Sequence, residues 1–308
     1  DGSAWPFGLE QATAPIEKAR AEGVVVIALD TPLDPEDATD ALFATDNYKA
    51  GVLIGEYARS VMGDDPVEIA TLDLAPGITV GQLRHDGFLD GYGIEADDPQ
   101  VVCQQDTQGD QAKGQTAMEN CLQANHDINV VYPINEPAAF GAYTALEAVG
   151  RENDVLIVSV DGGCAGVEGI VSGQIGATSQ QYPLKMASLG LEAIVEYAKT
   201  GNAPSGYTDT GVTLITNNPQ DGIESENAVF GVESCWGEPS EGALEAAEES
   251  VAAAGDSGAE VSGDASGAII GLITKTETNP FFVKMKEGAE KAAAEFGFSL
   301  GPLGHQIE

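Results

Sequence analysis

The chain has 308 residues, which is enough for two lobes that each bury a core. Its formal net charge of −37 at pH 7 argues against nucleic acid and anionic membrane as partners, because both would be repelled. The apolar runs are too short to span a bilayer, and the first residues lack a basic segment followed by an apolar one, so neither a membrane helix nor a signal peptide is expected.

Amphipathic helical segments and short apolar strands alternate along the chain. The expected helices, in chain order, cover residues 12–22, 51–62, 79–92, 111–124, 137–148, 183–200 and 280–296. The expected strands cover residues 24–29, 67–74, 101–104, 128–133, 155–160, 175–179 and 269–273. This alternation is typical of an α/β protein whose parallel sheets carry helices on both faces, and the length of the chain predicts two such sheets.

The segment from residue 238 to residue 267 differs from the rest in composition. It is rich in Ala, Glu, Ser, Gly and Asp and has almost no large apolar residue. We expect a flexible acidic linker, in which residues 243–254 could form a transient helix.

Residues 269–297 follow the linker and have the form of an opening βα unit. An apolar strand leads into a polar loop, and Asn279 and Pro280 suit the N-cap and first position of a helix. A unit of this kind usually begins an α/β domain, yet here it stands near the end of the chain.

Polar and aromatic side chains follow several of the expected strands. Ligands of doubly wound sheets bind beyond the carboxyl ends of the strands, so these side chains are the candidate site. The set comprises Asp30, Arg84, Asn135, Asp161, Gln181, Asn279, Phe281 and Phe282.

These residue types suit a neutral polyol. Carboxylates accept hydrogen bonds from neighbouring hydroxyl groups, Arg donates in a planar fork, and amides do both. Phe rings can cover the C–H face of a sugar. Taken singly, each residue has an equally good structural explanation, because strand-end Asp often caps a helix and Phe often belongs to the core.

The four cysteines and three histidines give no sign of a metal site. An even number of cysteines suits two disulfides in an exported protein, and no Cys or His spacing is typical of zinc. We expect no metal and no cofactor.

The chain resembles type I periplasmic sugar-binding proteins of ABC importers, the ribose/galactose-binding class, and most closely the fructose-binding branch. The motifs that carry this resemblance are VIALDTP, TDNYKAG, GITVGQLRHDGF, DTQGDQAKGQTAMENC, YPINEPAAFGAY, IVSVDGG, ATSQQYP, SGYTDTGVTLIT and TETNPFFVKMKEGAE. In that family, all eight candidate residues match positions that contact the sugar.

The resemblance implies a protein without catalysis that captures fructose, or a similar ketose or pentose, for an ABC permease. It implies a monomer that is exported to the periplasm or the cell exterior. The parent protein could also carry a lipid anchor. We expect disulfides Cys103–Cys121, tying a strand to its following helix, and Cys164–Cys235, tying the tail to a loop that forms the site.

The chain departs from the family in three ways. Gly109 stands where the family often has an aromatic residue, which favours a furanose or a smaller ketose. The order of the segments is that of a circular permutation, natural or engineered, with a fragment of a tandem array as the alternative. One βα unit and a further strand of the family have no counterpart here.

We expect two lobes joined by a hinge and closing on the sugar. One lobe takes residues 1–44, 182–203 and 268–308, and the other takes residues 45–181 and 204–237. A sugar-responsive regulator or sensor of the same fold is the alternative, although no basic DNA-binding segment is evident. An enzyme is not expected, because Arg84 would keep Asp30 and Asp161 ionised, which does not suit a general acid.

Overall fold

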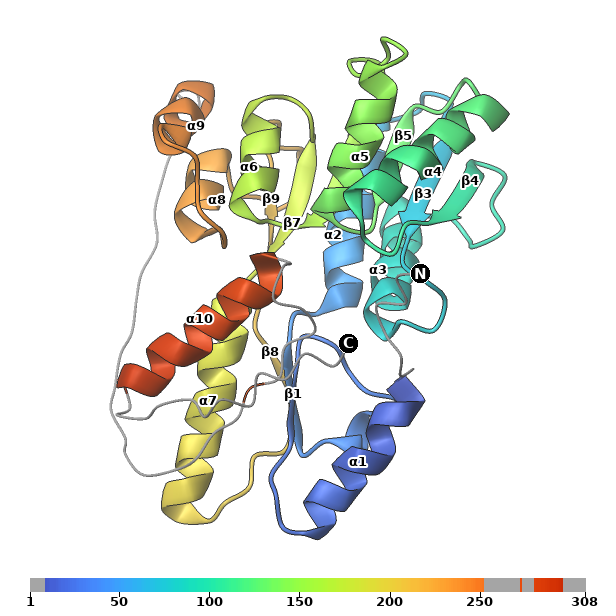
Figure 1. Ribbon diagram of the computed structural model, residues 1–308. Coiled ribbons are helices and arrows are strands. Elements are labelled where there is room, and N and C mark those ends of the chain that lie inside the picture. Colours follow the sequence, from blue (N-terminus) through green and yellow to red (C-terminus); the bar gives the residue numbers. More distant parts are fainter. Residues whose placement is uncertain (1–8, 252–271, 273–279, 296–308) are drawn as a thin grey trace. The chain divides into compact units, whose positions relative to one another are not determined.

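The computed structural model describes residues 9–251, 272 and 280–295. The chain divides into two compact units, each of which is built from separate segments (Figure 1). Unit 1 comprises Asp1–Thr45, Tyr182–Gly211 and Ala259–Glu308, and unit 2 comprises Asp46–Gln181 and Val212–Gly258.

Unit 2 is built on a six-stranded sheet. The strand order is β4 (Val101–Asp106), β3 (Ile69–Asp73), β5 (Val130–Pro133), β6 (Leu156–Asp161), β7 (Ala177–Gln181) and β9 (Val212–Ile215). All neighbours are parallel except β7 and β9, which are antiparallel. The carboxyl ends of the five parallel strands therefore lie along one edge.

Helices cover both faces of this sheet. They are α2 (Asn47–Met62), α3 (Thr79–Tyr92), α4 (Gln111–Ala124), α5 (Glu136–Glu147), α6 (Cys164–Val171) and α8 (Ala228–Ser234). Val130 of β5 packs in the core beneath α2 and α3, whereas its neighbour Val131 packs in the core beneath α4 and α5. This alternation is the period of two that a strand buried on both faces must have.

Glycines bring α2 and α3 into backbone contact. A Cβ atom added at Gly51 would lie 2.2 Å from the carbonyl oxygen of Arg84, and one added at Gly87 would lie 2.1 Å from that of Tyr48. Any larger residue would push the two helices apart, so glycine is required at both positions.

Unit 1 contains a parallel sheet in the order β1 (Ile27–Leu29), β2 (Ala41–Ala44) and β8 (Gly206–Asp209) within the described residues. Its helices are α1 (Leu9–Ala21), the 3-10 turn Glu36–Ala38, α7 (Pro183–Thr200) and α10 (Pro280–Glu295). Helix α7 contacts β1 and β2, and α10 packs on α7 (Figure 1). The sequence analysis assigned residues 206–209 to the other lobe, and this was wrong because β8 pairs with β2.

The expected acidic linker is ordered in its first part. Helix α9 (Ala243–Val251) contacts α6 and α8 in unit 2. Ala243, Ala247 and Val251 are buried at intervals of four residues, which places them on one face of the helix. Small side chains are enough to anchor this helix, so the lack of large apolar residues did not mean disorder here. Residues 252–267 lie outside the described residues.

Both expected disulfides are present, and both belong to unit 2. Cys103 of β4 is bonded to Cys121 of α4, and Cys164 of α6 is bonded to Cys235, which follows α8. None of the described helices has the length and apolar character needed to cross a bilayer.

Candidate functional site

The candidate site of unit 2 lies where three neighbouring parallel strands end. Asp161 is the last residue of β6, Gln181 is the last residue of β7, and Ile134 follows β5. Because parallel neighbours end at the same edge of the sheet, this geometry places their terminal residues side by side.

Arg84, from α3, joins these strand ends. Its Nη1 atom donates to Asp161 Oδ1 at 3.1 Å and to the carbonyl oxygen of Ile134 at 3.0 Å. Its Nε atom donates to Asn47 Oδ1 at 2.8 Å. Gln181 Nε2 donates to the same Asp161 Oδ1 at 2.7 Å. Three of the four expected residues of this unit, Arg84, Asp161 and Gln181, are therefore brought together.

This network is buried. Arg84, Asp161 and Gln181 are 5%, 8% and 2% exposed, respectively. A buried charge is costly unless it is paired and hydrogen-bonded, and here the guanidinium and the carboxylate satisfy each other. The hydrogen bonds of this polar cluster therefore hold its donors and acceptors in fixed positions.

Asn47 belongs to the network but was not among the expected site residues. It opens α2 directly after the N-cap Asp46, and its side chain is 2% exposed. The signal that could have found it is the one used for Asn135: an amide residue at the start of a helix that follows a strand.

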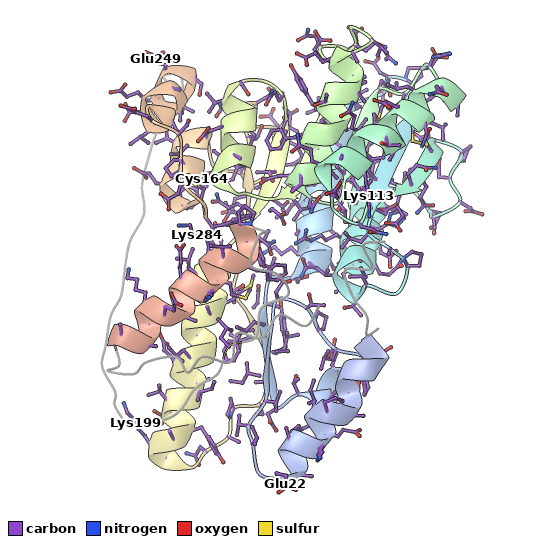
Figure 2. The ribbon with its side chains drawn as sticks, viewed as in Figure 1. Glu22, Lys113, Cys164, Lys199, Glu249 and Lys284 are labelled. Carbon is purple, nitrogen blue, oxygen red and sulfur yellow. A yellow bond between two sulfur atoms is a disulfide. The ribbon has the colours of Figure 1, made fainter. Side chains whose placement is uncertain are left out.

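The backbone of Asp161 is in an unusual conformation. Its φ angle is 139°, a region that residues other than glycine rarely adopt and that costs about 1–3 kcal/mol. Its carbonyl oxygen accepts a hydrogen bond from Trp236 Nε1 at 3.0 Å. Cys164, labelled in Figure 2, begins the helix that follows, and its disulfide ties this region to Cys235.

Glu136 is a buried carboxyl group next to this turn, and the sequence analysis missed it. Burial, with a smaller contribution from the charge of Asp161, raises the pKa of Glu136 to about 8. Hydrogen bonds from Thr178, Gly162 and Gly163 act in the opposite direction. The sequence shows only an acidic residue in the first turn of a helix, a position that is usually solvated.

Asn135 serves as the N-cap of α5. Its Oδ1 atom accepts from the backbone N–H of Ala138 at 3.2 Å, and its Nδ2 atom donates to the carbonyl oxygen of Gly109 at 3.1 Å. The capping role that the sequence analysis offered as the structural explanation is therefore present. Within the described residues, the second proton on Nδ2 has no acceptor.

Unit 1 carries the other expected residues. Asp30 directly follows β1, at the carboxyl end of the strand. Its φ angle is 73°, and the residue is 7% exposed. Phe281 is buried, and its ring meets that of Phe282 edge to face, with centroids 5.1 Å apart and planes at 89°. Asn279 lies outside the described residues.

His85 and Asp73 form a second polar pair in unit 2. His85 Nδ1 lies 2.9 Å from Asp73 Oδ1 at the end of β3, and each side chain is 13% exposed. The hydrogen bond from Asp73 raises the pKa of His85, and burial opposes this shift. Among the described residues, no cluster of three or more His, Cys, Asp or Glu could hold a metal ion.

A comparison with protein families matches residues 6–203 to the periplasmic binding protein domain. Two relatives are the ribose import binding protein RbsB of Bacillus subtilis (strain 168), 32% identical over 178 residues, and the D-allose-binding periplasmic protein of Escherichia coli (strain K12), 25% identical over 202 residues. The matches cover 58% and 64% of this chain but only 56% and 65% of the relatives.

A solved structure of a galactofuranose binding protein has the same fold. The superposition has a TM-score of 0.60 at 25% identity and covers 65% of this chain and 69% of that chain. All three relatives are named as binding proteins, and none is named as an enzyme.

Proposed function

Since the chain belongs to the periplasmic binding protein domain family, we propose that it is an extracytoplasmic protein that captures an uncharged monosaccharide for an ABC importer. The observation that carries the proposal is the buried network of Arg84, Asp161 and Gln181 at the strand ends of unit 2. The three relatives named above bind sugars according to their names, which supports the same class of ligand.

The chemistry of the network fits hydroxyl groups. The Oε1 atom of Gln181 is buried and accepts no hydrogen bond within the described part of the chain. A buried acceptor without a donor is costly, and a sugar hydroxyl would supply the donor. The carboxylate of Asp161 and the fork of Arg84 add an acceptor and donors of fixed orientation.

The proposal includes Asn135 of unit 2 and four residues of unit 1 as further sugar contacts. The unit 1 residues are Asp30, Asn279, Phe281 and Phe282. Asp30 and Phe281 are buried, as residues that enclose a ligand usually are. Each can be replaced singly and tested by the titration described below.

We further propose fructose, or a ketose or pentose of similar size, as the sugar. Gly109 supports this choice, since the family often has an aromatic side chain there. In this chain a Cβ at Gly109 would lie 2.7 Å from Asn135 Nδ2, and the φ angle of 68° also disfavours a side chain. The missing ring leaves one fewer apolar wall, which suits a smaller ring form.

We also propose that the order of the segments is a circular permutation of the family's order. In support, α10 near the end of the chain packs on α7 within unit 1, and α7 contacts the first two strands. Chains tolerate such rearrangement when the new ends lie in exposed loops.

Isothermal titration calorimetry against a panel of neutral monosaccharides, including fructose, ribose and allose, tests the function. We expect saturable binding of at least one sugar. Asp161→Asn should weaken it about 10- to 100-fold, because a hydrogen bond to a charged group is worth about 1.5–3 kcal/mol.

Asp154→Asn is the matched control. Asp154 is exposed and lies just before β6, at the end opposite to Asp161, so its replacement should leave the affinity unchanged. Titrations that show no binding of any monosaccharide would contradict the proposed function.

A further inference from the structure

Asp161 needs support from its surroundings. Its left-handed φ angle of 139° is unfavourable for a residue with a side chain, so neighbouring groups must hold the turn formed by Asp161, Gly162 and Gly163. The structure shows which groups do so.

Glu136 is the main anchor of this turn. Its Oε1 atom accepts from the backbone N–H of Gly162 at 2.7 Å, and its Oε2 atom accepts from that of Gly163 at 3.0 Å. Thr178 of β7 donates its hydroxyl to Oε1 at 2.8 Å. Both carboxylate oxygens are therefore used, and the side chain is only 4% exposed.

The local sequence leaves room for this carboxylate. A Cβ atom added at Gly166 would lie 1.9 Å from Glu136 Cδ, and one added at Gly163 would lie 3.1 Å from Glu136 Oε2. A buried carboxylate is costly unless donors surround it, and here the N–H groups of Gly162 and Gly163 and the hydroxyl of Thr178 do so. Two of these three hydrogen bonds come from backbone N–H groups of the turn, so the buried carboxylate holds the turn in place.

Trp236 holds the same turn from the other side. Its indole N–H bonds to the carbonyl oxygen of Asp161 at 3.0 Å, and its own carbonyl oxygen accepts from the N–H of Cys164 at 2.9 Å. The peptide unit that follows Asp161 is thus bonded at its oxygen by Trp236 and at its nitrogen by Glu136.

We propose that Glu136 is a positioning residue for sugar binding: it holds Asp161 in the conformation that bonds Arg84 and Gln181. This inference rests on the proposed function, because Asp161 is the residue that would bond the sugar. Glu136 itself acts through the backbone of the turn.

Glu136→Gln tests the proposal. An amide cannot accept from two N–H groups, one at each end, because its NH₂ group would face one of those donors. We expect the affinity for the sugar to fall by at least about tenfold, the order expected when hydrogen bonds to a charged group are lost. Glu168→Gln is the matched control, since Glu168 also accepts two hydrogen bonds, but from Ser240.

Trp236 gives a second readout, which a general loss of stability would not mimic. The chain has two tryptophans, so Trp5→Phe leaves Trp236 as the only one. In that background, Glu136→Gln should change the near-ultraviolet circular dichroism and the emission of Trp236 without sugar, while the far-ultraviolet spectrum stays native. Glu168→Gln should change neither.

A folded Glu136→Gln protein with an affinity within about twofold of the parent and an unchanged Trp236 spectrum would overturn the inference.

If that variant does not fold, Thr178→Val provides the test, because it removes one donor to Glu136 and leaves the carboxylate. It should weaken binding less than Asp161→Asn does and should shift the Trp236 spectrum; no change in either would overturn the inference. If the parent protein binds no sugar, the proposed function fails, and the Trp236 spectra still test the positioning role.

Discussion

The pairing of His85 with Asp73 makes the stability of unit 2 depend on pH. The hydrogen bond to Asp73 raises the pKa of His85 above its usual value of about 6.5. The folded state therefore binds this proton more tightly than the unfolded state. The resulting stabilisation is fully present below the unfolded pKa and is lost as the pH rises through the folded pKa.

His85→Gln should reduce the decline in the free energy of unfolding between about pH 6 and about pH 8. Urea unfolding of both proteins at the two pH values measures this. Glu136 is unchanged in both proteins, so an equal dependence of the free energy of unfolding on pH in the two proteins would contradict the role of His85.

At the level of single residues, the sequence predicted only part of the polar network at the strand ends of unit 2. Asp161 and Gln181 were predictable because they stand at strand ends, and Arg84 because it follows a strand and a loop. Glu136 and Trp236 were not, because their roles depend on how the turn after β6 folds over them. No spacing along the chain reveals such a contact.

Among the elements, the two disulfides constrain loops of different length within the same unit. The sequence separations are 18 residues for Cys103–Cys121 and 71 for Cys164–Cys235. A disulfide that closes a longer loop removes more entropy from the unfolded chain.

Replacing both cysteines of the longer loop by serine should therefore cost about 1 kcal/mol more than replacing both of the shorter one, within a typical loss of about 2–5 kcal/mol for each. Urea unfolding of the two double variants gives the comparison. A larger loss for the Cys103–Cys121 variant would show that local packing, rather than loop length, decides.

The buried strands of unit 2 were predictable because apolar side chains mark them on both faces. Strand β8 was placed in the wrong lobe, since all four of its residues are exposed and carry no such pattern. Helix α9 was expected to form only transiently, because its buried side chains are small. Ala243, Ala247 and Val251 recur at helical spacing, but the composition around them is typical of a linker.

Considered as a whole, the molecule carries far more negative than positive charge. With a formal net charge of −37, repulsion among carboxylates opposes the compact state. Salt screens this repulsion, because the Debye length falls from about 10 Å at 0.1 M to about 3 Å at 1 M.

The melting temperature should therefore rise by several degrees between low salt and about 1 M NaCl at neutral pH. Near the isoelectric point, at a pH of about 4.1, the same addition of salt should have much less effect. Differential scanning fluorimetry at both pH values tests this. A melting temperature that is independent of salt at neutral pH would show that the acidic groups are too far apart to repel one another.

The backbone contact between α2 and α3 limits which residues can be varied in the proposed sugar site. Gly51 rests on the carbonyl oxygen of Arg84, and Asn47, on the same helix, bonds the guanidinium. Arg84 belongs to α3 and also contacts α2, so a shift of either helix would displace its guanidinium group. Under the proposed function, variants meant to change the sugar preference should keep this pair of helices intact and replace side chains at the carboxyl ends of the strands.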